Sequence, residues 1–229
     1  MRTPSPDLVI GLTEAKPAPD GVVELVGDLL PSGDDDRPRC SWGTSTIDYA
    51  HYHDVEWGRP TIDERTLFEK MCLEGFQSGL SWLTILRKRE GFRAAFANFE
   101  AEKVAAFGPD DVERLLGDAG IVRHRGKIEA SINNAQALLE LWASGSTLAE
   151  VIWAHEPERS PAPFDFSTVP AKTDESTTLS KLLKKKGFRF VGPTTAYAAM
   201  QAMGVVNDHL AGCWVREECE IERKEMQTP

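Results

Sequence analysis

The stretch VVNDHLAGCW, residues 205–214, places His209 and Cys213 four residues apart. If this stretch is helical, the two side chains lie on one face of the helix, one turn apart, and can supply two ligands to a metal ion. No other cysteine or histidine lies within the twenty residues before it, and only Cys219 follows it. A complete metal site therefore needs ligands from a distant segment, and the ion would tie that segment to this one.

The composition of the 229-residue chain is typical of a globular protein, with 41% hydrophobic and 27% charged residues. Its apolar runs are too short to cross a bilayer and its first residues do not form a secretory signal. We therefore expect no membrane partner and a cytoplasmic location. In that setting the four cysteines are expected to be reduced thiols or metal ligands rather than disulfides.

The net charge of −10 argues against a nucleic-acid partner until its distribution is considered. Residues 1–38 hold eight acidic and three basic side chains, and residues 215–229 hold five acidic and three basic. The body of the chain between them is nearly neutral and has basic clusters at residues 87–89, 123–127 and 181–189. These clusters can serve as DNA-binding patches, or they can be solvated helix ends.

The chain divides into three parts. Residues 1–38 are rich in Pro, Gly and Asp and are predicted to form a disordered acidic tail. Residues 39–215 show helical periodicity almost throughout and are predicted to form the folded domain, whereas residues 216–229 are predicted to be a charged C-terminal tail. We therefore predict an all-α domain of many short helices, without strands.

Several helix boundaries can be predicted within the domain. Thr61 and Glu64 form a possible capping box at the start of a helix. Four prolines between residues 156 and 172 predict an extended connection. Further helices are predicted at residues 125–142, 148–155, 176–186, 193–203 and from Asp208 onward.

Two segments combine aromatic rings with a carboxylate. The first, CSWGTSTIDYAHYHDVEWG at residues 40–58, contains Trp42, Tyr49, Tyr52 and Trp57. The second, CLEGFQSGLSW at residues 72–82, places Glu74 between apolar stretches and ends at Trp82. Aromatic faces with a lone carboxylate suit a flat ligand that is cationic or bears an amine. Taken singly, each ring could equally belong to the core, and Glu74 could pair with an arginine.

The segment GDAGIVRHRGK, residues 117–127, predicts two helices joined by a tight turn, as in a helix-hairpin-helix motif. The turn amides and the N-terminus of the second helix can hold a DNA phosphate. Gly120 fits the first glycine of the usual pattern, but Arg123 stands about where a second glycine is common. Helix pairs that bind no DNA also use glycine turns, so the motif alone leaves both interpretations open.

Considered together, four motifs resemble the 3-methyladenine DNA glycosylase I family, in the same order and with matching spacing from Arg39 to Cys213. They are RCSW with DYAHYHDVEWG, LFEKMCLEGFQSGLSWLTILRKRE, DAGIVRHRGKI, and KKKGFRFVGPTTAYAAMQAMGVVNDHLAGC. The resemblance implies an all-α, multi-helix, helix-hairpin-helix DNA glycosylase fold with one structural zinc ion. It implies a monofunctional enzyme that flips out and hydrolytically excises 3-methyladenine from alkylated double-stranded DNA during base excision repair.

The resemblance also supplies the missing half of the metal site. The matching zinc ligands are Cys40, His53, His209 and Cys213. Two sulfurs and two imidazoles suit tetrahedral Zn²⁺ and leave no open position for catalysis. Because the two pairs are far apart in the sequence, the ion would be a clip joining the N- and C-terminal ends of the domain. Cys219 is expected to be a free thiol in the tail.

The resemblance assigns the base pocket residue by residue. Glu74 matches the carboxylate that accepts hydrogen bonds from the adenine edge and favours a cationic base, and it is the candidate catalytic residue. Tyr49 and Tyr52 match pocket residues, Trp82 matches the ring that stacks on the base, and Trp42 is expected to form another wall. Base recognition is therefore expected to come from one carboxylate enclosed by rings.

Contacts with DNA are assigned in the same way. Gly79 and Leu80 match a pair that fills the gap left in the duplex by the flipped nucleotide, although Leu80 could instead be an ordinary core leucine of a helix. The hairpin residues Gly120, Arg123 and Arg125 are expected to hold phosphates. The partner is therefore double-stranded alkylated DNA, and nothing in the sequence requires more than a monomer.

Two absences shape the expected mechanism. The sequence has no aspartate between Asp118 and Asp165, which argues against a strong general base on the helix after the hairpin, and no lysine is evidently placed as a Schiff-base nucleophile. Water is therefore the expected nucleophile, without strand cleavage. The alternative is a noncatalytic zinc-containing DNA-binding module of the same fold. A zinc hydrolase is disfavoured, because four protein ligands leave no position for water.

Overall fold

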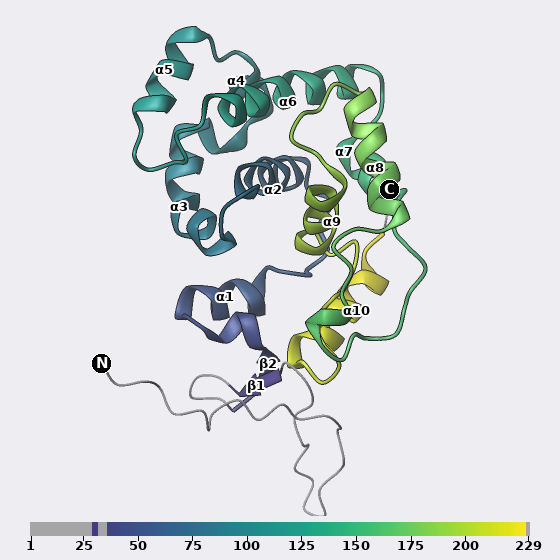
Figure 1. Cartoon of the computed structure of the whole chain (residues 1–229). Coiled ribbons are helices and arrows are strands. Elements are labelled where there is room, and N and C mark those ends of the chain that lie inside the picture. Colours follow the sequence, from purple (N-terminus) through teal and green to yellow (C-terminus); the bar gives the residue numbers. More distant parts are fainter. Residues whose placement is uncertain (1–28, 32–35, 228–229) are drawn as a thin grey trace, which may run out of the picture.

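The computed structural model describes residues 29–31 and 36–227 (Figure 1). Most of the acidic tail predicted at residues 1–38 lies outside the described residues. The part that is described forms a strand β1 (Leu29–Pro31), which pairs antiparallel with β2 (Pro38–Cys40), with Leu29 opposite Cys40. The ladder is short and ends at the first expected metal ligand, and beyond it the predicted all-α fold is confirmed.

Beyond the ladder, the described chain is helical. The helices are α1 (Ile47–Val55), α2 (Glu64–Gln77), α3 (Trp82–Ala95), α4 (Ala101–Ala105), α5 (Pro109–Gly117), α6 (Arg125–Ala143), α7 (Leu148–Trp153), α8 (Asp174–Lys185), α9 (Pro193–Ala202) and α10 (Trp214–Glu225), with 3-10 turns η2 (Ser41–Thr44), η3 (Ala97–Phe99) and η4 (Phe166–Thr168). No helix in the described ranges has the length and apolarity needed to span a membrane.

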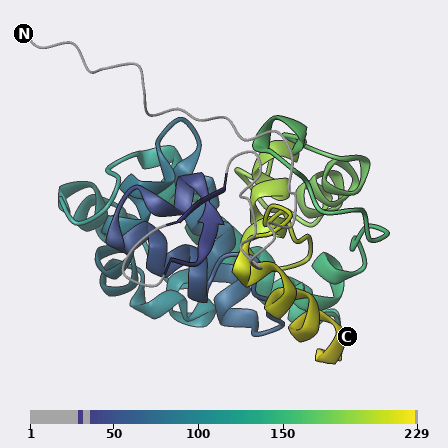
Figure 2. The ribbon, with the colours of Figure 1, turned by 90° about the horizontal axis from the view of Figure 1, so that it is seen from below.

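Helix α2 lies at the centre of the fold, in contact with α3, α6, α7 and α9 (Figure 1). Its residues from Met71 to Phe76 are all buried, so the helix is enclosed around its circumference rather than amphipathic. In Figure 2 the green and yellow segments gather on one side and most of the purple, blue and teal segments on the other. A polar side chain in the middle of α2 is therefore held inside the domain.

Phenylalanine rings join α2 to α3 and η3. Phe76 packs against Phe92 at a centroid distance of 4.5 Å, and Phe96 stacks on Phe99 at 5.7 Å. All four rings are buried in the main core. Since each such ring is worth about 1.5–3 kcal/mol when it leaves water, this cluster fixes the angle between the two helices that bound the candidate site.

The start of α2 differs from the predicted capping box. Asp63 is the N-cap and accepts a hydrogen bond from the Thr66 amide at 2.9 Å, whereas the Thr61 hydroxyl only accepts from the Asp63 amide at 3.3 Å. Aspartate is as good an N-cap as threonine, and it stands directly before the first helical residue. Glu64 is thereby released for another task.

The Glu64 carboxylate caps a different helix. It accepts hydrogen bonds from the amides of Leu148 and Ala149, at 2.9 and 2.8 Å, in the first turn of α7. It also accepts from Trp142 Nε1 at 2.6 Å, near the end of α6. A negative charge at the N-terminus of α7 satisfies free amides and complements the helix dipole. One side chain therefore ties α2 to the α6–α7 turn.

The C-terminal helix begins and ends later than predicted. Residues 207–213 are not helical and include Gly212, which has φ of +86°, and α10 begins at Trp214 with Cys213 as its N-cap. The helix then continues to Glu225, past the domain end expected at residue 215. Arg223 is buried on it and donates to Val205 O at 2.9 Å, and Arg59 pairs with Glu218 at 2.7 Å. Residues 216–225 are thus packed on the domain.

Replacing Glu64 by glutamine should destabilise the domain. The amide keeps one acceptor where three donors converge, and it removes the charge that complements α7. We expect Glu64→Gln to lower the free energy of unfolding by about 2 kcal/mol, measured by urea denaturation. Glu102→Gln, at an exposed position of α4, is the matched control and should change little. Equal midpoints for the two variants would contradict this role of Glu64.

Candidate functional site

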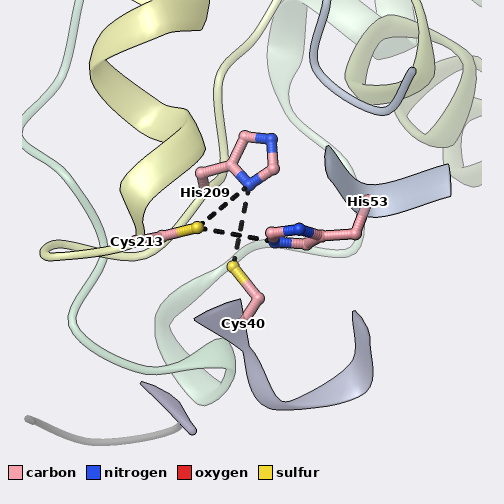
Figure 3. Close-up of side chains that lie close together, drawn as sticks. All are labelled: Cys40, His53, His209 and Cys213. Carbon is pink, nitrogen blue, oxygen red and sulfur yellow. Dashed lines mark hydrogen bonds between the residues drawn. The ribbon is translucent and has the colours of Figure 1, made fainter. Parts of the chain in front are cut away.

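The fold brings the four expected metal ligands together (Figure 3). Cys40 comes from the end of β2, His53 from α1, His209 from the 207–213 turn, and Cys213 from the N-cap of α10. All four side chains are buried, and their ligand atoms all lie within 4.8 Å of one another. Although His209 and Cys213 do not share a helix as predicted, the turn brings Cys213 Sγ to 3.6 Å from His209 Nδ1.

The spacing of these atoms fits a tetrahedral ion. Zn–S and Zn–N bonds of about 2.3 and 2.05 Å at a tetrahedral angle place sulfur and nitrogen about 3.6 Å apart. The Cys213 Sγ–His53 Nε2 distance is 3.5 Å, and the Cys40 Sγ–His209 Nδ1 distance is 3.8 Å. The four residues could therefore hold a metal ion.

Outer hydrogen bonds orient both imidazoles for this task. His209 Nε2 lies 3.0 Å from Trp57 O, which only accepts, so Nε2 carries the proton and Nδ1 keeps its lone pair. His53 Nδ1 donates to Asp54 at 2.8 Å, which leaves Nε2 facing Cys213. Arg39 holds Asp54 through bonds of 2.8–3.0 Å and lowers the carboxyl pKa together with His53, although burial opposes this effect. Carboxylates and carbonyls behind histidines are typical of metal sites.

Two glycines make room for the ligand rings, and sequence reasoning missed them. A Cβ atom on Gly58, which has φ of +79°, would lie 2.9 Å from His209 Nε2, and one on Gly43 would lie 2.8 Å from the His53 ring. The signal available in the sequence was their position within the aromatic segment. Cys219, expected in a tail, is instead buried beside this cluster on α10.

Glu74 lies on the inner part of α2 and its residue surface is only 5% exposed. Burial raises the pKa of its carboxyl to about 8, although Lys70 opposes the shift. Among the described residues, none donates a hydrogen bond to this carboxylate. A buried carboxyl with unused acceptor sites costs free energy unless a ligand satisfies it, which marks Glu74 as a candidate binding group.

An aromatic group from α1 and α3 lies near Glu74, whose charge acts on the Tyr52 phenol. Tyr52 is buried, and its ring centroid lies 5.3 Å from that of Trp82. Burial and the nearby Glu74 raise the pKa of the Tyr52 phenol, so that the hydroxyl stays a neutral donor. Trp82 Nε1 is buried and has no hydrogen-bond partner among the described residues. The site therefore presents unused donors and acceptors between apolar faces.

Trp42 connects this aromatic group to the metal cluster. Its ring lies 5.5 Å from Tyr49, 6.3 Å from Tyr52 and 5.3 Å from His53, measured between centroids. Tyr52 and His53 are also neighbours on α1, so one side of the helix faces the aromatic site and another faces the cluster. A change in the metal cluster would therefore reach the wall of the aromatic site through α1 and Trp42.

A buried ion-pair network lies one turn before Glu74, and sequence reasoning missed it. Lys70 donates to Ala202 O at 2.9 Å and to Glu56 at 3.1 Å, and Arg89 of α3 also pairs with Glu56. Lys70 and Glu74 stand four residues apart on α2, a spacing that could have suggested the relation. The network therefore holds the Lys70 ammonium one helical turn before Glu74 on α2.

The connection between α2 and α3 forms an exposed tip. Gly79 has φ of +84°, and Leu80 is 39% exposed and lies outside both helices, so it is not a core leucine of a helix. Gln77 closes the tip, because its side-chain amide donates to Leu80 O at 2.7 Å. Lys127 supports the tip from α6 by donating to Ser78 O at 2.6 Å.

The segment predicted as a hairpin joins α5 to α6 through residues 118–124. The Gly120 amide donates to Asp118 Oδ1 at 2.7 Å and its carbonyl packs against Gly91 of α3. Arg123 is exposed and makes no side-chain hydrogen bond or ion pair with the described residues. Arg125 is exposed but paired with Glu113 at 2.6 Å.

Lys127 does not belong to the exposed basic cluster in which the sequence places it. Its residue surface is only 7% exposed, and its ammonium also donates to Phe76 O at 2.9 Å. The side chain thus satisfies carbonyls at the C-terminus of α2, where a cation complements the helix dipole. Of this cluster, only the arginines and His124 reach the surface.

Comparison with known proteins gives a consistent result. Residues 42–217 match the methyladenine glycosylase family. A relative from Escherichia coli (strain K12), DNA-3-methyladenine glycosylase 1, is 51% identical over 178 residues, which cover 76% of this chain and 95% of the relative.

Two solved structures are similar to this chain in fold as well as in sequence. A crystal structure of 3-methyladenine DNA glycosylase I has a TM-score of 0.75 and 47% identity, covering 77% of this chain and 98% of its own. A Tyr-to-Phe variant of 3-methyladenine DNA glycosylase I in complex with 3-methyladenine has a TM-score of 0.74 and 37% identity, covering 78% and 97%. By family match, identity and all-helical fold, the chain belongs to the methyladenine glycosylase family.

Proposed function

We propose that the protein is a monofunctional DNA glycosylase that excises 3-methyladenine from alkylated double-stranded DNA. The observation that carries the proposal is the buried Glu74 carboxyl, which has no donor among the described residues and lies near Tyr52, whose ring packs against Trp82. Family membership and the relative solved with 3-methyladenine support it. The catalytic residue is Glu74, and Tyr49, Tyr52, Trp82 and Trp42 bind the base.

Methylation at N3 makes the adenine of DNA cationic and weakens its glycosidic bond. An ionised Glu74 then provides the complementary charge and accepts from the adenine edge, while the rings of Tyr52 and Trp82 contact its faces. Burial strengthens this attraction, because the surroundings of Glu74 screen charge weakly. An unmethylated, neutral adenine gains no such attraction from the Glu74 charge. The same carboxylate therefore binds the methylated base and discriminates against the unmethylated one.

The reaction needs water but no covalent enzyme intermediate. The bond between C1′ and N9 breaks with its electron pair moving to the base, which leaves as neutral 3-methyladenine. The oxygen of water bonds to C1′, a proton passes to solvent, and an abasic site remains. Because the base is already activated, extraction is the main task, and flipping costs a few kcal/mol.

We infer that Cys40, His53, His209 and Cys213 hold one zinc ion with a structural role. The buried Cys₂His₂ set and its sulfur–nitrogen distances support Zn²⁺ over metals that prefer oxygen. When bound, the ion supplies cross-linking between β2, α1 and the start of α10. Asp54 and Trp57 O hold the imidazole protons at His53 Nδ1 and His209 Nε2. The other two ring nitrogens, His53 Nε2 and His209 Nδ1, are then free to bind the ion.

The DNA contacts belong to the same proposal. Leu80 at the exposed tip, beside Gly79, would fill the gap left by the flipped nucleotide. Gly120 and Arg123, in a helix-hairpin-helix, would hold phosphates, and Arg125 would exchange its carboxylate partners for a phosphate. The protein would act as a monomer in the cytoplasm, with a folded domain that starts near residue 39 and extends through α10. A noncatalytic DNA-binding module is the competing possibility. Measuring whether the protein releases 3-methyladenine from methylated DNA distinguishes the two.

Replacing Glu74 by glutamine tests the proposal directly. We expect Glu74→Gln to lower kcat/KM for release of 3-methyladenine from methylated DNA by at least about 100-fold, because charge stabilisation is lost. Its free energy of unfolding should stay equal or rise, since a neutral amide is easier to bury. Glu69→Gln, on the same helix but paired with Arg93, is the control. Tight binding of DNA without base release by the wild-type chain would favour the module.

The pKa of Glu74 predicts a pH dependence. Since the ionised carboxyl is the active form, kcat/KM should rise with pH through about 8, and the rise in kcat should occur at lower pH, because a cationic base favours ionisation. The raised pKa also means that the native chain holds a proton that the unfolded chain has lost. The free energy of unfolding contributed by this group therefore falls as pH rises toward about 8. Glu74→Gln should remove both slopes.

Replacing Cys213 by serine tests the zinc assignment. Cys213→Ser should lose most of the one zinc ion per chain, measured by elemental analysis, and should lower the Tm. Its folded fraction should still release base, because the cluster holds the frame and not the reacting atoms. Cys72→Ser, in the core away from the cluster, should keep its zinc. A fully folded, metal-free and inactive Cys213→Ser would make the structural role wrong.

A further inference from the structure

The turn between α8 and α9 holds an exposed aromatic side chain in a strained conformation. Phe190 has φ of +55° and is 40% exposed. Phe99 has the same φ, but it is buried in the core, where packing accounts for its position. A left-handed conformation costs a residue with a Cβ about 1–2 kcal/mol. Phe190 has this cost without the full burial that offsets it for Phe99.

Side chains from two helices impose this conformation. Asn134, buried on α6, accepts from the Arg189 amide at 2.7 Å and donates to Arg189 O at 3.0 Å. Ser180, buried on α8, donates to Val191 O at 2.6 Å. Bonds to both neighbours of Phe190 fix the backbone on either side of it. A strained residue that its surroundings over-determine in this way often serves a function.

Phe190 lies between two elements of the proposed site. Its ring centroid is 6.4 Å from that of His124, the N-cap of α6, and its Cζ would lie 3.9 Å from a Cβ on Gly126. Its own Cβ would lie 3.5 Å from one on Gly75, the residue after Glu74. The turn therefore packs on the N-terminus of the helix after the hairpin and on the helix that carries the catalytic carboxyl.

Among the described residues, cations without counter-charges occur next to Phe190 in the sequence, at the end of α8, and before the N-terminus of α6 on which Phe190 packs. Arg123, Lys184, Lys185 and Arg189 are exposed, and their side chains make no ion pair or hydrogen bond with the described part of the chain. By contrast, most arginines elsewhere in the described part are paired, as Arg87 is with Asp48. Arg189 also lines a groove of about 390 Å³ between α5, α6 and the turn, where Arg125 is paired with Glu113 and Glu129 and Arg189 is not paired with any described residue. Free cations around an exposed ring suit a polyanion with apolar surfaces between its charges.

We propose that the Arg189–Phe190 turn is a second DNA anchor, in which Arg189 binds a phosphate and the Phe190 ring contacts the sugars and base edges of the minor groove. Apolar side chains of this kind press on the minor groove in many proteins that bend DNA. Together with Leu80 in the connection between α2 and α3, the anchor would hold the duplex at two points. The inference rests on the proposed function for its choice of DNA as the ligand.

The test compares Phe190→Ala with Phe190→Gly in the full chain, using fluorescence anisotropy with an unmodified duplex. Both variants should bind about 10-fold more weakly than the wild type, through loss of the ring. Phe190→Gly should have a higher Tm than Phe190→Ala, because glycine accepts the left-handed backbone without strain. Phe164→Ala, which removes a ring that is 62% exposed in the connection before α8, is the control and should bind like the wild type.

Arg189→Gln separates the charge from the ring. It should weaken binding and lower the slope of log K against log salt by about one, whereas Phe190→Gly should leave that slope unchanged. Wild-type affinity in Phe190→Ala and Phe190→Gly would overturn the inference. If the wild-type chain binds duplex but releases no 3-methyladenine, the proposed function fails and the anchor does not, because its test uses unmodified DNA.

Discussion

The burial of α2 is the constraint on which the rest of the structure depends. A helix enclosed by α3, α6, α7 and α9 must satisfy every polar group that it carries into the core. Lys70 finds Glu56 and Ala202 O, and Lys127 binds the carbonyls at the helix end. Glu74 is the exception, with no donor among the described residues. The domain thus keeps one acceptor unsatisfied at its centre, and a ligand that brings donors and positive charge supplies what the protein omits.

The metal cluster and the aromatic site share α1, and this shared helix explains why distant segments are joined. His53 faces the cluster and Tyr52 faces Glu74, so the orientation of α1 sets both. A helix of nine residues has little stability of its own and depends on its contacts. Arg39 and Asp54 fix His53 from behind, and Trp42 packs against His53 and Tyr52. An ion held by these four residues would cross-link β2 and α1 to the start of α10 and would thereby steady a wall of the site.

The sequence predicted the all-α fold and the convergence of the four candidate metal ligands, because both leave local patterns or long motifs. Sequence-based prediction failed where a side chain's partners are distant in the sequence, or where an unusual backbone conformation sets the local structure. Glu64 looked like part of a capping box, but its partners are the amides of α7, some 85 residues away. Lys127 looked like a surface charge, and only tertiary packing shows that its ammonium binds a carbonyl at the C-terminal end of α2. A turn at residues 207–213, with a positive φ at Gly212, stands where a helix was predicted, and the positive φ of Phe190 could not be foreseen because phenylalanine rarely adopts it.

The distribution of charge resolves how an acidic chain can act on a polyanion. In the described part most arginines pair with carboxylates, as Arg87 does with Asp48, so they add little net field. Within that part Arg123 and Arg189 are exposed and unpaired, and they flank the N-terminus of α6, whose dipole has the same sign. A field made by a few uncompensated cations is local, because salt screens it beyond about 10 Å. Negative charge elsewhere on the chain then opposes nonspecific attachment without weakening the contact at this face, and the protein can leave undamaged DNA.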